Sequence, residues 1–233
     1  MPRVKPVVLS HRRVGVVALA LIAVTTTIWL THLPPKEQQV GFTCGSDTCH
    51  EVTVHPMNID TPFTEDAIDL TGDGDPEIVR LEGHEIRVLQ NGKEIWRSDP
   101  TWQVVDVALG DPNNDGRYEI LAALWKPNDT DERLSHPYII AHRGGMIKLI
   151  WGGSAVTHPI HELLLADMDG DGVQELVVLE SASPESPSDT SKRTLSVWDW
   201  HGWGFNLRWR SAPGYYHALN VQEENGIVVT LRK

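Results

Sequence analysis

The sequence predicts an all-β protein whose strands are organised in repeats, and three observations carry this prediction. An acidic nine-residue motif occurs three times, beginning at Asp69, Asp111 and Asp167. Short aliphatic runs surround each motif, are bounded by turn residues and lack helical length. A Trp precedes the next motif at nearly constant spacing, 15 residues from Trp96 to Asp111 and 16 from Trp151 to Asp167. Self-similarity of this kind is typical of folds built from repeated units.

The N-terminal residues predict a membrane anchor. Four basic side chains stand near the start of the chain: Arg3, Lys5, Arg12 and Arg13. The uncharged apolar stretch 14–33 follows, and about 20 such residues can cross a bilayer as a helix whose basic flank stays in the cytoplasm. We therefore expect a single-pass membrane protein with a cytoplasmic segment 1–13, a transmembrane anchor 14–33, a stalk 34–40 and an extracytoplasmic domain 41–233. A cleaved signal peptide is the alternative.

Charge agrees with a domain outside the cytoplasm. All 32 acidic residues lie beyond residue 36, whereas four of the 20 Lys and Arg residues precede it. The remaining 16 basic residues leave the domain a formal charge of −16. A surface of this sign repels phosphate backbones, so the composition argues against nucleic acid as a partner.

The two cysteines, Cys44 and Cys49, allow two interpretations. In an oxidising compartment they would form a disulfide around the intervening turn. Because His50 follows directly, the pair also resembles a c-type haem attachment motif, for which His55 or Met57 would be the second axial ligand. The disulfide is favoured, since a four-residue spacer is not the usual spacing for haem.

The repeated motif has the chemistry of a cation-binding loop. Oxygen-bearing side chains stand at positions 1, 3, 5 and 9, and a glycine at position 6 allows the loop to curl around a hard cation such as calcium. An EF-hand is excluded, because that loop needs a bidentate Glu at position 12 and the residues here are Arg80, Ala122 and Val178. Without a cation the carboxylates of one loop would repel each other, so the metal would also stabilise the fold.

Each repeat supplies four short strands. The expected strands are 67–68, 78–81, 86–89 and 95–96 in the first repeat, 104–109, 120–124, 138–141 and 150–151 in the second, and 163–166, 176–179, 195–198 and 208–209 in the third. The motif joins the first two strands each time, and the fourth carries the repeated Trp: Trp96, Trp151 or Trp209. Four antiparallel strands in succession form one blade of a β-propeller. These three Trp residues are expected to pack between blades.

A fourth blade begins near the C-terminus but has only two strands, at 217–221 and 226–231. Two extended stretches before the first repeat, at 41–43 and 51–54, could supply the missing third and fourth strands. The sequence therefore predicts a small propeller of about four blades, in which the last blade is shared by both ends of the chain and no sheet edge is left open. An open half-propeller completed by another chain is the alternative.

Residues 60–233 resemble the FG-GAP/VCBS repeats of integrin-α-type β-propellers. In that family calcium is bound by positions 1, 3, 5 and 9 of the loop and by the backbone carbonyl of position 7. Carried over by position, the resemblance implies up to three calcium ions, held by Asp69, Thr71, Asp73, Asp75 and Glu77, by Asp111, Asn113, Asp115, Arg117 and Glu119, and by Asp167, Asp169, Asp171, Val173 and Glu175.

This chain departs from the family pattern in three respects. Position 9 is Glu where integrins usually carry Asp, Thr71 is a neutral ligand, and the Phe-Gly and Gly-Ala-Pro signatures are absent. Because more anionic ligands bind calcium more tightly at similar geometry, the third loop is expected to be the tightest.

The function expected from these features is a non-enzymatic binding or assembly module tethered to the membrane. The sequence has no nucleophile elbow, phosphate loop or zinc-protease motif. A subunit of a membrane complex, with or without haem, and a carbohydrate-binding module are the alternatives. Sugar stacking would involve Trp198, Trp200 and Trp203, although core packing is the favoured interpretation of these residues.

Two polar inserts, 126–136 and 181–193, indicate where a partner protein would bind. Both are expected to be exposed, on the face opposite the cation loops. The residues expected near a partner are Trp102, Asn128, Asp129, Asp131, Glu132 and Arg133.

Overall fold

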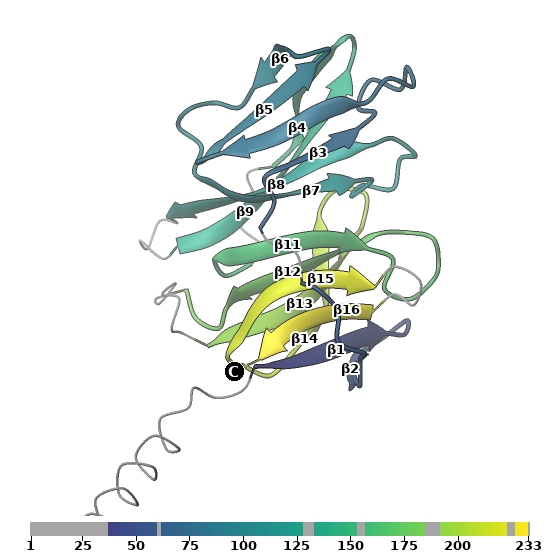
Figure 1. Cartoon of the computed structure of the whole chain (residues 1–233), viewed down its shortest axis with the longest axis vertical. Coiled ribbons are helices and arrows are strands. Elements are labelled where there is room, and N and C mark those ends of the chain that lie inside the picture. Colours follow the sequence, from purple (N-terminus) through teal and green to yellow (C-terminus); the bar gives the residue numbers. More distant parts are fainter. Residues whose placement is uncertain are drawn as a thin grey trace, which may run out of the picture. The chain divides into compact units, whose positions relative to one another are not determined.

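The computed structural model of the chain (Figure 1) describes residues 37–59, 62–127, 133–152, 157–184, 192–222 and 227–232. Every regular element within these residues is a strand, which confirms the all-β prediction. The strands form four antiparallel sheets of four strands each. No helix long and apolar enough to cross a membrane occurs in the described part of the chain, and the expected anchor 14–33 lies outside it.

Three of the sheets coincide with the three predicted repeats. The first sheet contains β3 (Glu65–Ile68), β4 (Glu77–Glu82), β5 (Glu85–Gln90) and β6 (Lys93–Arg97). The second contains β7 (Val104–Gly110), β8 (Glu119–Pro127), β9 (Arg133–Arg143) and β10 (Met146–Trp151). The third contains β11 (Ile160–Ala166), β12 (Glu175–Ser181), β13 (Arg193–Trp200) and β14 (Phe205–Arg210). Within each sheet, consecutive strands are neighbours, as expected for a meander.

The fourth sheet joins strands from both ends of the chain. Its order is β15 (Tyr216–Gln222), β16 (Ile227–Arg232), β1 (Gln38–Cys44) and β2 (Cys49–Val52). β1 runs antiparallel to β16, with Val40 opposite Thr230 and Phe42 opposite Val228, so the N-terminal and C-terminal strands lie side by side in Figure 1. The prediction that N-terminal residues supply the third and fourth strands of the last sheet is confirmed.

Three segments differ in extent from the sequence prediction. The predicted stalk reaches residue 40, but β1 begins at Gln38 because Val40 is a buried core residue. The polar insert 126–136 is largely a hairpin extension, since β8 continues to Pro127 and β9 begins at Arg133. Ser135 is fully buried within this extension, where it donates its N–H to Thr157 and its hydroxyl accepts the N–H of Ile160. The insert 181–193 likewise starts and ends within strands, at residues that are buried.

Apolar clusters fill the space between consecutive sheets. β8 shows why: Ile120, Ala122 and Leu124 point toward the first sheet, while Leu121 and Ala123 point toward the third. This strand is buried on both faces, which explains its continuous apolar sequence. A third cluster lies between the third and fourth sheets. The repeated fourth-strand Trp residues occupy one cluster each, as predicted: Trp96, Trp151 and Trp209.

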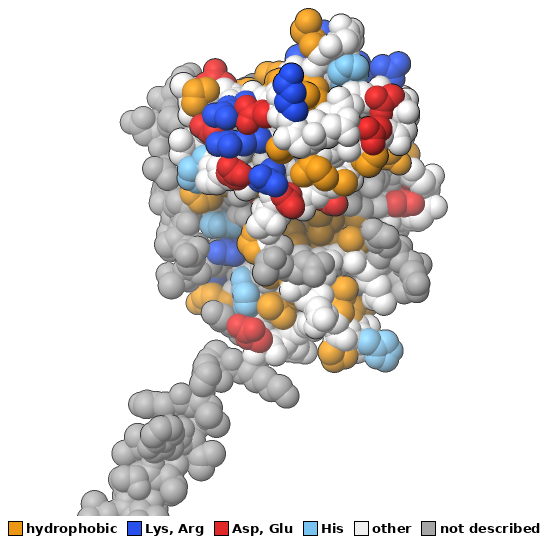
Figure 2. All heavy atoms as spheres, turned by 45° about the horizontal axis from the view of Figure 1, so that its top comes forward, with side chains coloured by type: hydrophobic (Ala, Val, Ile, Leu, Met, Phe, Trp, Pro, Cys, Tyr) orange, Lys and Arg blue, Asp and Glu red, His pale blue; other side chains and the backbone are white. Residues whose placement is uncertain are grey.

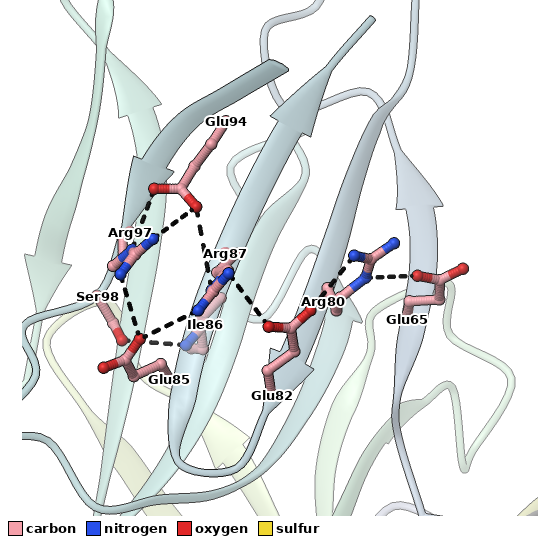
Figure 3. Close-up of polar contacts among 9 residues, drawn as sticks. All are labelled: Glu65, Arg80, Glu82, Glu85, Ile86, Arg87, Glu94, Arg97 and Ser98. Atoms are coloured by element: carbon pink, nitrogen blue, oxygen red, sulfur yellow. Dashed lines mark hydrogen bonds and ion pairs between the residues drawn. The ribbon is translucent and has the colours of Figure 1, made fainter. Parts of the chain in front are cut away.

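The outer face of the first sheet carries many charged side chains beside the exposed Ile78. Figure 3 shows the arrangement: Arg80 pairs with Glu65 at 2.7 Å and with Glu82 at 3.3 Å, and Arg97 pairs with Glu94 at 3.0 Å. Acidic and basic side chains accordingly gather on the upper part of the surface in Figure 2. Among the described residues, no apolar cluster joins this face to the fourth sheet. The described residues therefore form four sheets with three apolar junctions, which is one junction fewer than a closed ring of four blades requires.

Candidate metal centres

The three acidic motifs form loops between the first and second strands of their sheets, as predicted. They connect β3 to β4, β7 to β8 and β11 to β12. The ninth residue of each loop is the first residue of the second strand, where its side chain is buried: Glu77 and Glu119 are 0% exposed, and Glu175 is 2% exposed. Each loop therefore carries exposed acidic groups at its tip above one carboxylate that the core encloses.

Backbone hydrogen bonds curl the loops in the same way. The glycine N–H at position 6 is donated to the Asp side chain at position 1, at 2.8 Å in the first loop, 2.7 Å in the second and 3.0 Å in the third. The N–H of position 7, which belongs to Asp75, Arg117 or Val173, is donated to the Asp at position 5 at distances from 2.8 to 3.1 Å. Glycine is required at position 6 because φ there is between 81° and 89°. Bonds from Gly74, and then from Gly72 and Asp73, lower the pKa of Asp69.

The buried Glu distinguishes the second loop from the other two. In the first loop Leu70 donates its N–H to Glu77 Oε2 at 2.9 Å, and in the third Met168 donates to Glu175 Oε2 at 2.8 Å. The corresponding residue of the second loop is Pro112, which has no N–H. Glu119 Oε2 is consequently buried without a hydrogen-bond partner among the described residues. An orphaned carboxylate oxygen is costly in a protein core, so it favours the binding of a cation.

Arginine side chains reach into two of the loops. Arg143, the last residue of β9, contacts Asp115 Oδ2 at 2.6 Å and Glu119 Oε1 at 2.5 Å with its Nη2. Arg208 of β14 contacts Asp169 Oδ2 at 2.7 Å and Glu175 Oε1 at 3.3 Å.

The first loop has a neutral group at the corresponding place. Gln90, the last residue of β5, donates its amide to Glu77 Oε1 at 3.0 Å. Thr71 also donates its hydroxyl to Glu77 Oε1, at 3.4 Å. The repeated motif does not predict Gln90, Arg143 or Arg208, because these residues lie on strands outside it.

Acidic side-chain oxygens converge in the two loops that an arginine from a neighbouring strand contacts. Oxygens of Asp111, Asp115 and Glu119 lie within 4.8 Å of one another, and so do those of Asp167, Asp169 and Glu175. The acidic residues of the first loop, Asp69, Asp73 and Glu77, form no such group in the described structure. Like charges gather more readily beside a cationic group, which the first loop lacks.

The donor sets fit a hard cation. Carboxylate and amide oxygens are the ligands that calcium prefers, and the second loop adds the unpartnered oxygen of Glu119. Burial raises the pKa of Glu119 to about 7 although Arg143 opposes the shift, and burial also raises the pKa of Glu175 to about 7 against the Met168 N–H. A bound cation would favour the ionised carboxylates.

A glutamine links the second and third loops. Gln174, at position 8 of the third loop, accepts the N–H of Asp111 with its side-chain oxygen at 2.9 Å. Gly110 permits this approach, since a Cβ at that position would lie 2.4 Å from the same oxygen. The second and third loops are therefore joined by a direct hydrogen bond.

The cysteines form the favoured disulfide, Cys44–Cys49, which closes the hairpin between β1 and β2. Both sulfur atoms that covalent haem would require are used in this bond. His50 and His55 are exposed on the same hairpin and the segment after it.

The other candidate residues are mostly packed. Trp198 is 6% exposed and Trp200 is half-buried, both in the cluster between the second and third sheets, whereas Trp203 is 76% exposed. Trp102, expected near a partner, packs edge-on against Tyr138 with ring centres 4.9 Å apart.

The remaining residues expected near a partner belong to the insert 126–136. Asn128, Asp129, Asp131 and Glu132 lie outside the described residues, and Arg133 is described only as part of β9.

One serine and histidine pair has a hydrogen bond of catalytic type. His161 Nε2 lies 2.9 Å from Ser181 Oγ, but Ser181 is fully buried, so its hydroxyl is not accessible to a substrate.

The chain matches no protein-family model, and no curated protein is similar to it.

Proposed function

We propose that this protein is a calcium-stabilised, non-enzymatic binding or assembly module, held outside the cytoplasm by its N-terminal anchor. The observation that carries the proposal is the geometry that the three loops share, together with the orphaned oxygen of Glu119. The resemblance to FG-GAP/VCBS repeats supports the same assignment.

Calcium would be held by oxygens from positions 1, 3, 5 and 9 of each loop. The exposed acids supply charge at the tip, and the buried Glu supplies a ligand anchored in the second strand of the sheet. When bound, the ion offers positive charge to carboxylates that otherwise repel one another. Because each loop joins the two strands at the start of its sheet, the ion would hold these strands together.

The arrangement of sheets supports a propeller as the architecture of this module. The inner strands β7, β11 and β15 line one pocket together with Pro62 and Phe63, which directly precede β3. Acidic residues connect these strands: Asp106 accepts the N–H of Leu163 at 2.8 Å, and Glu162 accepts the N–H of Leu219 at 2.7 Å. In the proposed closed form, the fourth sheet would also meet the charged outer face of the first.

The repetition of the acidic clusters supports a non-enzymatic role. Within the described part of the chain two acidic clusters could hold a metal ion, and both belong to the repeated loops. A repeated structural element is better explained by stabilisation than by one active centre. Binding would then depend on the loops opposite the metal sites.

Isothermal titration of the purified full-length chain with calcium tests this proposal. We expect calcium binding that magnesium does not reproduce, because magnesium demands stricter octahedral geometry and dehydrates reluctantly. Glu119→Gln keeps the shape of the side chain and should remove one binding event. Absence of calcium binding by the folded wild type would refute the proposal.

A further inference from the structure

An arginine at the end of β9 brings a positive charge to the second loop. Arg143 Nη2 lies 2.6 Å from Asp115 Oδ2 and 2.5 Å from Glu119 Oε1, so one guanidinium nitrogen contacts carboxylates from positions 5 and 9. Its side chain is 19% exposed, whereas that of Glu119 is 0% exposed. Contacts of this length to a largely buried group are stronger than a solvent-exposed ion pair.

The first loop supplies an internal comparison. Gln90 and Arg143 both end the third strand of their sheets, directly before the two-residue turns Asn91-Gly92 and Gly144-Gly145. Each reaches Oε1 of the buried Glu in its own loop. The two loops therefore differ at equivalent places by one positive charge.

We propose that Arg143 is a built-in competitor for the cation of the second loop, so that this loop fills at a higher calcium concentration than the first. This inference rests on the proposed function, since it assumes that the loops bind calcium. Glu119 Oε2 remains available to the ion, while Asp115 Oδ2 and Glu119 Oε1 are already neutralised by Arg143.

The arginine has an alternative contact when the ion enters. Arg143 Nη1 donates to the carbonyl of His142 at 3.0 Å, so the side chain keeps a partner if its bonds to the loop lengthen. Exchange between arginine and calcium would make the second loop responsive to calcium over a range in which the first loop is already filled. The positive charge of Arg143 therefore changes the order of calcium affinities that the number of anionic ligands alone would predict.

Calcium titration calorimetry of full-length variants tests the inference. The background Asp73→Asn and Asp171→Asn weakens the first and third loops at exposed position-5 residues while keeping an oxygen for the loop hydrogen bonds. In this background, Arg143→Gln copies the first loop and should tighten calcium binding at least about tenfold, since ligand charge tunes affinity over orders of magnitude.

Three further variants separate charge from other effects. Arg143→Lys keeps the positive charge and should bind calcium within a few-fold of the arginine form. Arg117→Gln removes an exposed positive charge from the same loop and should change affinity much less than Arg143→Gln. Gln90→Arg, in the otherwise unchanged chain, should weaken binding to the first loop.

The outcomes distinguish this inference from the proposed function. If Arg143→Gln and Arg117→Gln have equal effects, or if Arg143→Gln leaves affinity unchanged while calcium still binds, the competitor role is overturned and the proposed function stands. If the wild type and all variants fail to bind calcium, both are overturned. Should Arg143→Gln fail to fold, Gln90→Arg decides, because unchanged affinity of the first loop would also overturn the inference.

Discussion

Single residues determine how the three loops differ. Pro112 removes the N–H that Leu70 and Met168 donate in the other loops, and Glu119 is left with an orphaned oxygen. One backbone donor thus separates a satisfied carboxylate from an unsatisfied one. The sequence shows Pro112, but its significance depends on the position of the Glu side chain seven residues later, which only the folded loop reveals.

Replacing Pro112 with Ala tests this explanation. In the presence of a chelator, Pro112→Ala should raise the free energy of unfolding by about 1 kcal/mol, because a buried unsatisfied acceptor costs about 1–3 kcal/mol and loss of a proline offsets part of the gain. Urea unfolding measures the change. Pro76→Ala is the matched control, since Glu77 already has its donor, and it should not stabilise the protein. Equal effects of both substitutions would contradict the role assigned to Pro112.

Asp106 makes stability depend on pH. Burial raises its pKa to about 7, although the N–H groups of Leu163 and Val107 oppose the shift, and Glu162 raises it further. The pKa of an unfolded Asp is about 3.9, so the folded state binds the proton more tightly. The stability of wild type relative to Asp106→Asn should therefore rise as pH falls from about 7 to about 4. Chemical unfolding across this range tests the difference, and a flat difference curve would exclude a raised pKa.

At the level of elements, the sequence predicted the positions of the strands better than the contacts on the faces of their sheets. Alternation and repeats located all four strands of the first three sheets, because burial on one or both faces leaves a direct pattern in the residues. The ion pairs of the first sheet were missed, although Arg80 and Glu82 alternate with Val79 and Leu81 in β4, whereas β8 and β12 contain the continuous apolar runs 120–125 and 176–179. That contrast already indicates that one face of the first sheet is polar. The arginines that contact the acidic loops were missed because a contact between side chains of different strands leaves no periodic pattern in the sequence.

A disulfide joins the paired ends of β1 and β2. Cys44→Ser combined with Cys49→Ser should lower the free energy of unfolding by about 2–3 kcal/mol, the usual effect of a short disulfide loop, although both cysteines also pack in a buried cluster. The loss should be local, since only the fourth sheet contains this hairpin. Hydrogen exchange should therefore accelerate in β1 and β2 while β8 and β12 stay protected. Uniform loss of protection would show that the hairpin supports the entire domain.

For the whole molecule, the fourth sheet joins the two ends of the chain. A chain beginning at Asp60 would lack β1 and β2 and would expose the edge of β16, to which β1 normally pairs. This truncated form should aggregate or dimerise, whereas the full-length chain solubilised in detergent should show no association through that edge. Light scattering compares the two. A truncated form that stays monomeric and as stable as the full chain would show that the N-terminal strands are dispensable.

The most direct test of the account is the thermal unfolding of the full-length protein with calcium and with a chelator. One site that binds only the folded state adds about 2.7 kcal/mol at a calcium concentration 100 times its dissociation constant. For a domain of roughly 200 residues this corresponds to a rise of about 5–10 °C in the melting temperature. We predict such a rise with calcium and a clearly smaller one with magnesium. A melting temperature that is the same in calcium and in chelator would contradict the claim that the three loops are calcium sites.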